Sequence, residues 1–191
     1  MNKKGLTLFF ICLACFLCLS AVCAADGNAT IHHVKSSLSN DEIQTMFDNA
    51  NDGDTFILTN HVYKNVSLVV DKKINIISNN SGGGLWPPSV SQKAKIMGIT
   101  ETFGFYFTNN SGGSRLSGIT IISDLNDYGV IVDSSDNTII KNNKGTGSQK
   151  AGILIKDSNN VEVSFNSISK SVGDGLQLKN VGFSSIKNNT I

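Results

Sequence analysis

The sequence predicts an all-β fold: a right-handed single-stranded parallel β-helix with an N-terminal capping helix. In the second half of the chain glycines recur at a spacing of about 23 residues, an apolar triplet follows each glycine, and apolar positions within a repeat alternate with the period of a strand. Short strands of this kind cannot bury an apolar face alone. Successive repeats must therefore stack and share one core.

Residues 1–25 are typical of a secretory signal peptide. A basic start, MNKKG, precedes an apolar run from Leu6 to Val22, and small residues follow up to Ala25. An uncleaved anchor helix is the alternative, because the run approaches the length that spans a bilayer. A lipoprotein cleaved at Cys23 is disfavoured, since Val22 stands where such sites take a small residue. We expect a secreted or cell-surface protein that is extracellular and wall-associated.

The composition of the chain limits its partners. All four cysteines lie within the leader, so we expect no disulfide in the mature protein. Sixteen lysines and arginines balance 15 acidic residues, and Arg115 is the only arginine. We therefore expect no nucleic-acid surface, and no membrane contact beyond the signal segment.

The first part of the mature chain is expected to close one end of the β-helix. Residues 26–38 are predicted to be extended, and residues 39–55 to form a capping helix and a turn. Ser39 and Glu42 have capping-box spacing, and Ile43 and Phe47 share one helical face. This face can cover the first coil, whose strand edges would otherwise be open.

Residues 56–191 are predicted to form repeats of about 23 residues. Gly129, Gly152 and Gly175 are equally spaced, one repeat apart, Gly104 precedes them at a slightly longer interval, and the triplets FYF, VIV, ILI and LQL follow in turn. We expect five or six coils, stacked at the usual strand separation of about 4.8 Å. The chain stops in mid-repeat at Ile191, so we expect either a truncated fragment or a lower face covered by something else.

A second register of the same period is an asparagine ladder formed by Asn143, Asn166 and Asn189. A side-chain amide has two donors and one acceptor, so amides stacked one coil apart can bond to each other and to the backbone of a tight corner. We interpret the ladder as structural. A row of ligand-binding amides is the alternative.

The capping helix, the pattern A-x-x-G-D-T ending at Thr55, the strand HVYKN, the run KKINIIS and the NNTI-type repeats together resemble the pectate-lyase-like β-helix proteins. The likeness is greatest to the adhesin-like surface proteins of methanogenic archaea and covers nearly all of the mature chain. It implies an adhesin-like cell-surface protein that binds a glycan or a partner surface. Because the fold also carries enzymes, a polysaccharide lyase or hydrolase relative, or a non-functional fragment of one, is the alternative.

No catalytic residue is predicted. An enzyme on this fold needs carboxylates, or a carboxylate and a base, on adjacent coils. Stacking at one repeat length places Asp133 over Lys156 and then Lys179, which balances charge instead of gathering carboxylates. Arg115 is a candidate lyase base, but its column neighbours are Ile139 and Glu162, which is thin support.

No metal site and no cofactor are expected. Asp124 and Asp127 share one loop and can hold calcium, but paired aspartates more often serve turn hydrogen bonds. The histidines at positions 32, 33 and 61 have no ligand spacing. A soft-ligand copper site is disfavoured, since the mature chain has no cysteine and only two methionines.

Two features are candidate binding surfaces. Tyr106, Ile131 and Leu154 occupy the outward position of successive triplets and are expected to form an exposed apolar stripe. Cover by a loop or by the N-terminal segment is the alternative. Trp86, the only tryptophan, is a candidate sugar-stacking platform, although such a residue more often attaches its loop to the body.

Five N-x-S/T sequons suit an exported glycoprotein, although asparagine-rich turns also produce such triplets by chance. The candidate glycosylation sites are Asn28, Asn65, Asn79, Asn109 and Asn188.

Overall fold

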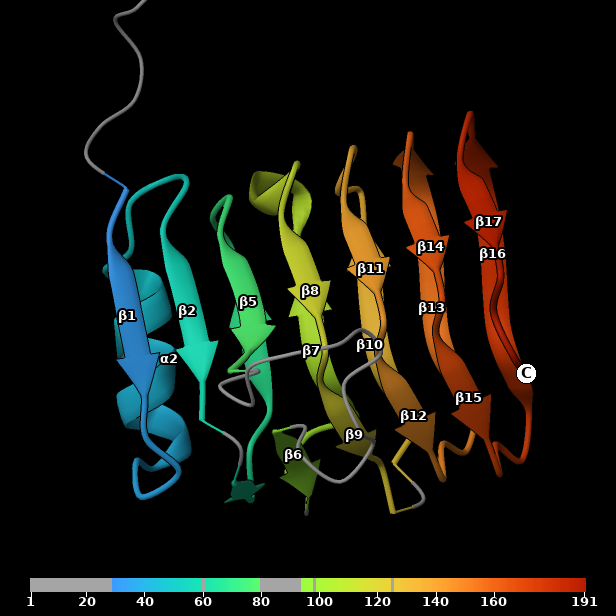
Figure 1. Ribbon diagram of the computed structural model, residues 1–191. Coiled ribbons are helices and arrows are strands. Elements are labelled where there is room, and N and C mark those ends of the chain that lie inside the picture. The colour runs from blue at the N-terminus through green and yellow to red at the C-terminus, as the bar shows by residue number, and fades with distance from the viewer. Residues whose placement is uncertain (1–28, 60, 80–93, 98, 125) are drawn as a thin grey trace, which may run out of the picture.

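The computed structural model describes residues 29–59, 61–79, 94–97, 99–124 and 126–191. These residues form a parallel β-solenoid of about six turns with one helix near the N-terminus (Figure 1). The predicted fold class, a right-handed parallel β-helix, is confirmed.

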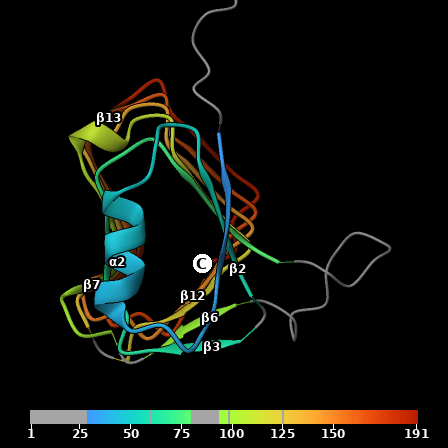
Figure 2. The ribbon, with the colours of Figure 1, turned by 90° about the vertical axis from the view of Figure 1, so that its left-hand side faces the viewer.

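Each coil contributes strands to three parallel sheets, which enclose the core in the view along the axis (Figure 2). Sheet A comprises β1 (Ile31–Val34), β2 (Thr55–Leu58), β5 (Asn75–Ser78), β8 (Arg115–Ser117), β11 (Ile139–Lys141), β14 (Glu162–Ser164) and β17 (Ser185–Lys187). Sheet B comprises β3 (Val62–Lys64), β6 (Lys95–Met97), β9 (Thr120–Ile122), β12 (Lys144–Thr146) and β15 (Ser167–Ser169). Sheet C comprises β4 (Leu68–Val70), β7 (Phe103–Phe107), β10 (Tyr128–Asp133), β13 (Ala151–Asn159) and β16 (Asp174–Gly182).

The core consists of columns of apolar side chains, because the inward positions of each strand face those of the next coil. Leu116, Ile140 and Val163 are in register in sheet A, and all three are fully buried. Burying each such side chain contributes roughly 1.5–3 kcal/mol. The alternation seen in the sequence is therefore the inside and outside of the solenoid wall.

The glycine spacing reflects close packing of coil against coil. A Cβ atom on Gly104 would lie 2.7 Å from the carbonyl oxygen of Gly129, and one on Gly129 would lie 2.7 Å from that of Gly152. A Cβ atom on Gly152 would likewise lie 2.8 Å from the carbonyl oxygen of Gly175. Only glycine fits this column without moving the backbone of the neighbouring coil.

The predicted asparagine ladder is present as a chain of hydrogen bonds. The Nδ2 of Asn143 donates to the Oδ1 of Asn166 at 3.2 Å, and the Nδ2 of Asn166 donates to the Oδ1 of Asn189 at 3.0 Å. The same two amides also donate to the carbonyls of Leu116 and Ile140. Both donors of each buried amide are thus used within the wall, which favours the structural interpretation over a row of ligand-binding amides.

Helix α2 (Asn40–Asp48) covers the N-terminal edge of sheet C (Figure 2). It begins at the capping box of Ser39 and Glu42 and buries Ile43 and Phe47. The Gln44 side-chain amide accepts from the N–H of Val69 at 2.9 Å and donates to its carbonyl at 3.0 Å. The amide therefore takes the place of a neighbouring strand, which satisfies the outer edge of β4.

Strand β1, within the segment predicted to be extended, is the first strand of sheet A and pairs with β2. The buried Asp54 carboxylate joins this strand to the helix turn by accepting from the N–H of Thr30 at 2.7 Å, from His32 at 3.0 Å and from the N–H of Asn51 at 3.0 Å. Burial alone would raise the pKa of this carboxyl, but these hydrogen bonds lower it below its usual range.

The glycine column predicts a steric cost for a single methyl group. Gly129→Ala places a Cβ against a backbone oxygen of the next coil, so we expect a loss of about 2 kcal/mol in the free energy of unfolding. Gly145→Ala is the matched control, because its Cβ would meet only the Ile168 side chain at 3.9 Å. Urea denaturation followed by circular dichroism measures both, and equal stability of the two variants would contradict the packing argument.

The asparagine ladder predicts a second loss of stability. Asn166→Ala leaves the buried N–H and Nδ2 groups of Asn143 without their acceptor and the Ile140 carbonyl without its donor. Unsatisfied buried groups cost about 1–3 kcal/mol each, so we expect a total loss of about 3 kcal/mol. The same denaturation experiment measures it, and a loss below about 1 kcal/mol would show that the ladder contributes little.

Candidate functional site

Two shallow hollows lie at opposite ends of the strands of sheet C. The Glu101 hollow, of about 340 Å³, lies before β7 and β10 and is lined by Thr100, Glu101, Thr102, Asn126 and Asp127. The Tyr106 hollow, of about 250 Å³, lies where the same strands end and is lined by Tyr106, Thr108, Asn109, Asp133 and Ser134. Both linings are mainly polar, which suits a hydrophilic ligand.

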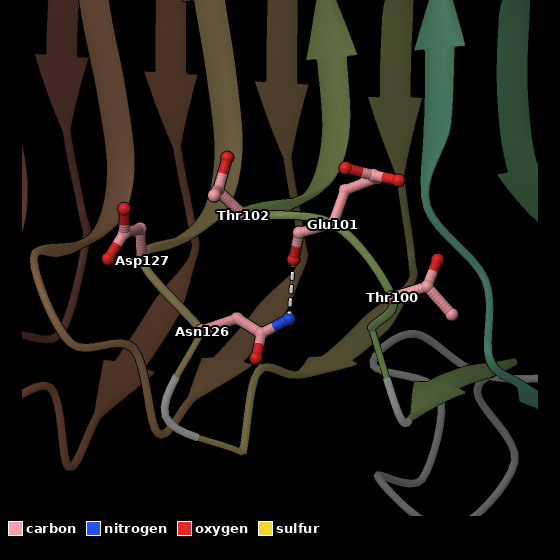
Figure 3. A pocket seen from close by; sticks show the side chains of 5 residues that line it. All are labelled: Thr100, Glu101, Thr102, Asn126 and Asp127. Atoms are coloured by element: carbon pink, nitrogen blue, oxygen red, sulfur yellow. Dashed lines mark hydrogen bonds between the residues drawn. The ribbon is translucent and has the colours of Figure 1, made fainter.

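The polar groups that line the Glu101 hollow are largely bonded to other groups of the protein. The Asn126 amide donates to the carbonyls of Ile99 at 2.7 Å and Glu101 at 2.5 Å, and Figure 3 shows it reaching across the hollow. Asp127 forms an ion pair with Lys150 at 2.8 Å. The carboxylates of Glu101 and Asp127 point in different directions in Figure 3, so they do not converge on one ligand.

The Tyr106 hollow contains a charged network centred on Asp133. The Tyr106 hydroxyl donates to Asp133 Oδ2 at 2.7 Å, and the Lys156 ammonium pairs with the same oxygen at 2.7 Å. The Ser134 hydroxyl donates to the other carboxylate oxygen at 3.1 Å. Strand register places Lys156 directly beside Asp133 on the next coil, as the repeat spacing predicts.

This network sets the charges of the site at neutral pH. Burial alone would raise the pKa of the Asp133 carboxyl, but hydrogen bonds from Lys156, Tyr106 and Ser134 lower it. The hydrogen bond to Asp133 raises the pKa of the Lys156 ammonium. The hydrogen bond to Asp133, and to a lesser extent burial, raises the pKa of the Tyr106 hydroxyl. The site therefore presents an anion, a cation and a protonated phenol.

A second carboxylate, which the sequence did not indicate, lies on the far side of Thr108. Val70 and Val132 both pair with Phe107, so Asp71 and Asp133 follow on the coils to either side of Thr108. Asp71 accepts from the Thr108 hydroxyl and, at 3.1 and 3.2 Å, from the Asn110 amide. The offset from Val70 to Phe107 is longer than one repeat, so the repeat spacing holds no signal for Asp71.

The predicted exposed apolar stripe is wrong. Ile131 is 9% exposed and Leu154 is 5% exposed, and only Tyr106 is partly accessible. Outward side chains on adjacent coils stand one strand spacing apart and cover each other. Strand β1, in the described part of the N-terminal segment, lies in sheet A and does not provide this cover. Trp86 lies outside the described residues.

Arg115 has no acidic partner in the described part of the chain. Its register neighbours are Asn75 and Ile139, and Glu162 lies one coil further on. Glu162 pairs instead with Lys141 at 3.6 Å and Lys187 at 3.8 Å. The geometry therefore adds no support for Arg115 as a catalytic base.

The described residues offer no metal donor set. Among them there is no group of three or more histidine, cysteine, aspartate or glutamate side chains close enough to hold a metal ion. His32 is engaged with Asp54, and Met46 packs against the core. Asp127 is paired with Lys150, and Asp124 and Asp127 are not grouped with a third side chain of these types among the described residues.

Among the sequons, Asn65, Asn109 and Asn188 are exposed and Asn79 is half-buried, whereas Asn28 lies outside the described residues. Asn109 opens the short 3-10 helix η3 (Asn109–Ser111) and lines the Tyr106 hollow.

None of the described helices is long and apolar enough to cross a membrane.

The network predicts a titration shift. Asp133→Asn removes the anion that disfavours ionisation of Tyr106, so the pKa of Tyr106 should fall towards the usual tyrosine value of about 10. Ultraviolet titration of phenolate formation measures this, with Tyr106→Phe identifying the contribution of Tyr106. Asp157→Asn, an exposed carboxylate on β13, is the control and should leave the titration unchanged. An unshifted Tyr106 in Asp133→Asn would contradict the network.

Comparisons with known proteins agree with this architecture. A pectate lyase, Pel9A, has a crystal structure that superimposes with a TM-score of 0.60 at 11% sequence identity, covering 85% of this chain and 50% of that chain. This likeness shows the fold, and the chain spans half the length of that enzyme. No curated protein sequence matches the chain. The special likeness to archaeal adhesins stays a prediction.

A protein family matches residues 47–191, which is more than half of the chain, and its description is periplasmic copper-binding protein (NosD). That description places the family in the cell envelope, in agreement with the export predicted from the leader. On this match, the chain belongs to the NosD family of β-helix proteins.

Proposed function

We propose that this chain is an exported, adhesin-like β-helix protein that binds a glycan at the Tyr106 hollow and does not catalyse its cleavage. The observation that carries the proposal is the lining of the hollow, which combines hydroxyl groups, an amide and an ion-paired carboxylate around one aromatic ring. The partner is a polysaccharide of the cell wall or of another cell surface. The leader and the periplasmic family support the location.

Sugar hydroxyls need both donors and acceptors, and the hollow supplies both. Asp133 accepts, Lys156 donates, and the exposed Asn109 amide does either. The partly accessible Tyr106 ring, held 5.3 Å from Phe103 between ring centres, offers an apolar face. Aromatic rings with a polar end suit ligands that are apolar on one side and hydroxylated on the other.

The charge state of the site favours binding over cleavage. A hydrolase needs one carboxyl group with a raised pKa to act as acid, but the pKa of Asp133 is lowered. A lyase needs a neutral base, but the pKa of Lys156 is raised, which keeps it protonated. The groups nearest the hollow are thus in the wrong protonation states for either reaction.

A polysaccharide hydrolase or lyase remains the second candidate because of Asp71. Asp71 and Asp133 flank Thr108, and the backbones that carry them are two strand spacings, roughly 10 Å, apart. Inverting glycosidases hold their carboxyl groups about 6.5–9.5 Å apart. The family description also names copper, but the described donor groups do not fit that ion, so no step of the proposal uses it.

Glycan binding predicts a loss on removal of the hollow's own groups. Tyr106→Ala and Asp133→Asn should each weaken binding of wall polysaccharide fragments about tenfold, which corresponds to about 1.4 kcal/mol. A glycan array followed by calorimetry on the best fragment measures this, with Asp157→Asn as the control for a carboxylate outside the hollow.

Two results would overturn the proposal. If no glycan binds, or if both Tyr106→Ala and Asp133→Asn bind like the unaltered chain, then the hollow is not the site. If the purified protein releases reducing or unsaturated sugars, and Asp71→Asn abolishes the release, then the enzyme alternative is correct.

A further inference from the structure

The solenoid sorts charges that are balanced in the sequence. The whole chain has 16 basic and 15 acidic residues. In sheet B, the outward positions of the strands contain three lysines and no acidic residue. The inward positions, which include Tyr63, Ile96 and Ile121, are buried, so the remaining side chains of this sheet make up one outer face.

The three lysines of this face, Lys64, Lys95 and Lys144, are free of ion pairs within the described residues. Lys95 and Lys144 flank Thr120 in register, and Lys64 lies in the neighbouring outward column. Their charges therefore add instead of being neutralised locally, which gives an unbalanced positive field over a flat sheet.

Aliphatic side chains accompany the lysines. Val62 is 39% exposed, and Met97 and Ile122 are partly exposed on the same side of the sheet. Among the residues that the structure describes, no aromatic side chain lies on this face, since Tyr63 points inward, and neither of the two hollows described above opens there. Lysines with aliphatic residues suit the headgroup and acyl boundary of a bilayer, whereas a sugar chain is better held by aromatic rings or a groove.

The two edges of this face carry different side chains. Towards sheet A, Phe165 is 46% exposed, and the Lys141 ammonium lies 5.5 Å from its ring centre. Towards sheet C, Glu101 and Asp124 lie on the connections that follow β6 and β9. Because Lys141 is paired with Glu162 towards sheet A, and acidic residues lie towards sheet C, the unneutralised positive charge is confined to the lysines of sheet B.

We propose that the outer face of sheet B docks flat on an anionic phospholipid surface. In Figure 2 this face, marked by β3, β6 and β12, forms the lower side of the solenoid. The lysine ammonium groups contact lipid phosphates, and Val62, Met97 and Ile122 reach the headgroup boundary. The near-zero net charge led to the expectation of no such contact, but a local field depends on where the charges lie.

Sedimentation with lipid vesicles tests this proposal. The full chain should bind phosphatidylcholine vesicles containing one-third phosphatidylglycerol more tightly than vesicles of phosphatidylcholine alone. Each lysine near an anionic surface adds roughly fivefold, so Lys64→Gln, Lys95→Gln and Lys144→Gln combined should reduce the preference about a hundredfold. The leader is common to all variants and does not affect the comparison.

The control combines Lys35→Gln, Lys150→Gln and Lys179→Gln, which remove the same charge from exposed sites outside sheet B. It should retain nearly all of the preference, as should Tyr106→Ala, which tests the glycan site separately. Equal losses in the two triple variants would overturn the proposal by showing a response to net charge alone. No preference for anionic vesicles, or binding of soluble polygalacturonate at this face instead, would also overturn it.

Discussion

Backbone pairing between successive parallel coils is the constraint on which the rest of the structure depends. Because each strand pairs in register with its counterpart one coil later, residues of one kind are brought into columns. The column at Gly129 allows close backbone approach, and the column at Asn166 satisfies the corner. Buried serines do the same at another corner, where Ser111 and Ser135 share a hydrogen bond of 2.8 Å. The wall is held by repetition of a few contacts.

The same pairing decides the chemistry of the surface. Asp133 beside Lys156 is an ion pair only because the coils are in register, and that pair keeps both groups charged. The pair holds both groups in their stable charged states, whereas catalysis needs one group held in its less stable protonation state. The outward lysines of sheet B show the opposite arrangement, in which a column and its neighbour gather one charge. Two faces of one solenoid can thus serve two different contacts.

Particular residues show where the repeat pattern predicts contacts and where it does not. The Asn143 to Asn189 ladder and the pairing of Asp133 with Lys156 follow from a constant offset, and both are present. Asp71 was missed because the coil that carries it departs from the repeat length. The expected stripe at Ile131 and Leu154 failed because exposure depends on neighbouring side chains, which a periodic pattern does not describe. His32 likewise gained a partner, Asp54, only through the pairing of β1 with β2.

The sequence alone determined the solenoid, its coil length, its helix cap and its internal ladders, because a parallel stack of equal coils converts spacing along the chain directly into contact in space. Only the tertiary structure decided which outward residues are accessible, that Asp71 and Asp133 lie on either side of Thr108, and that the lysines of sheet B share one face. The physical reason is that these properties depend on coils of unequal length and on which of the three sheets each strand joins. Neither is set by the local period of the sequence.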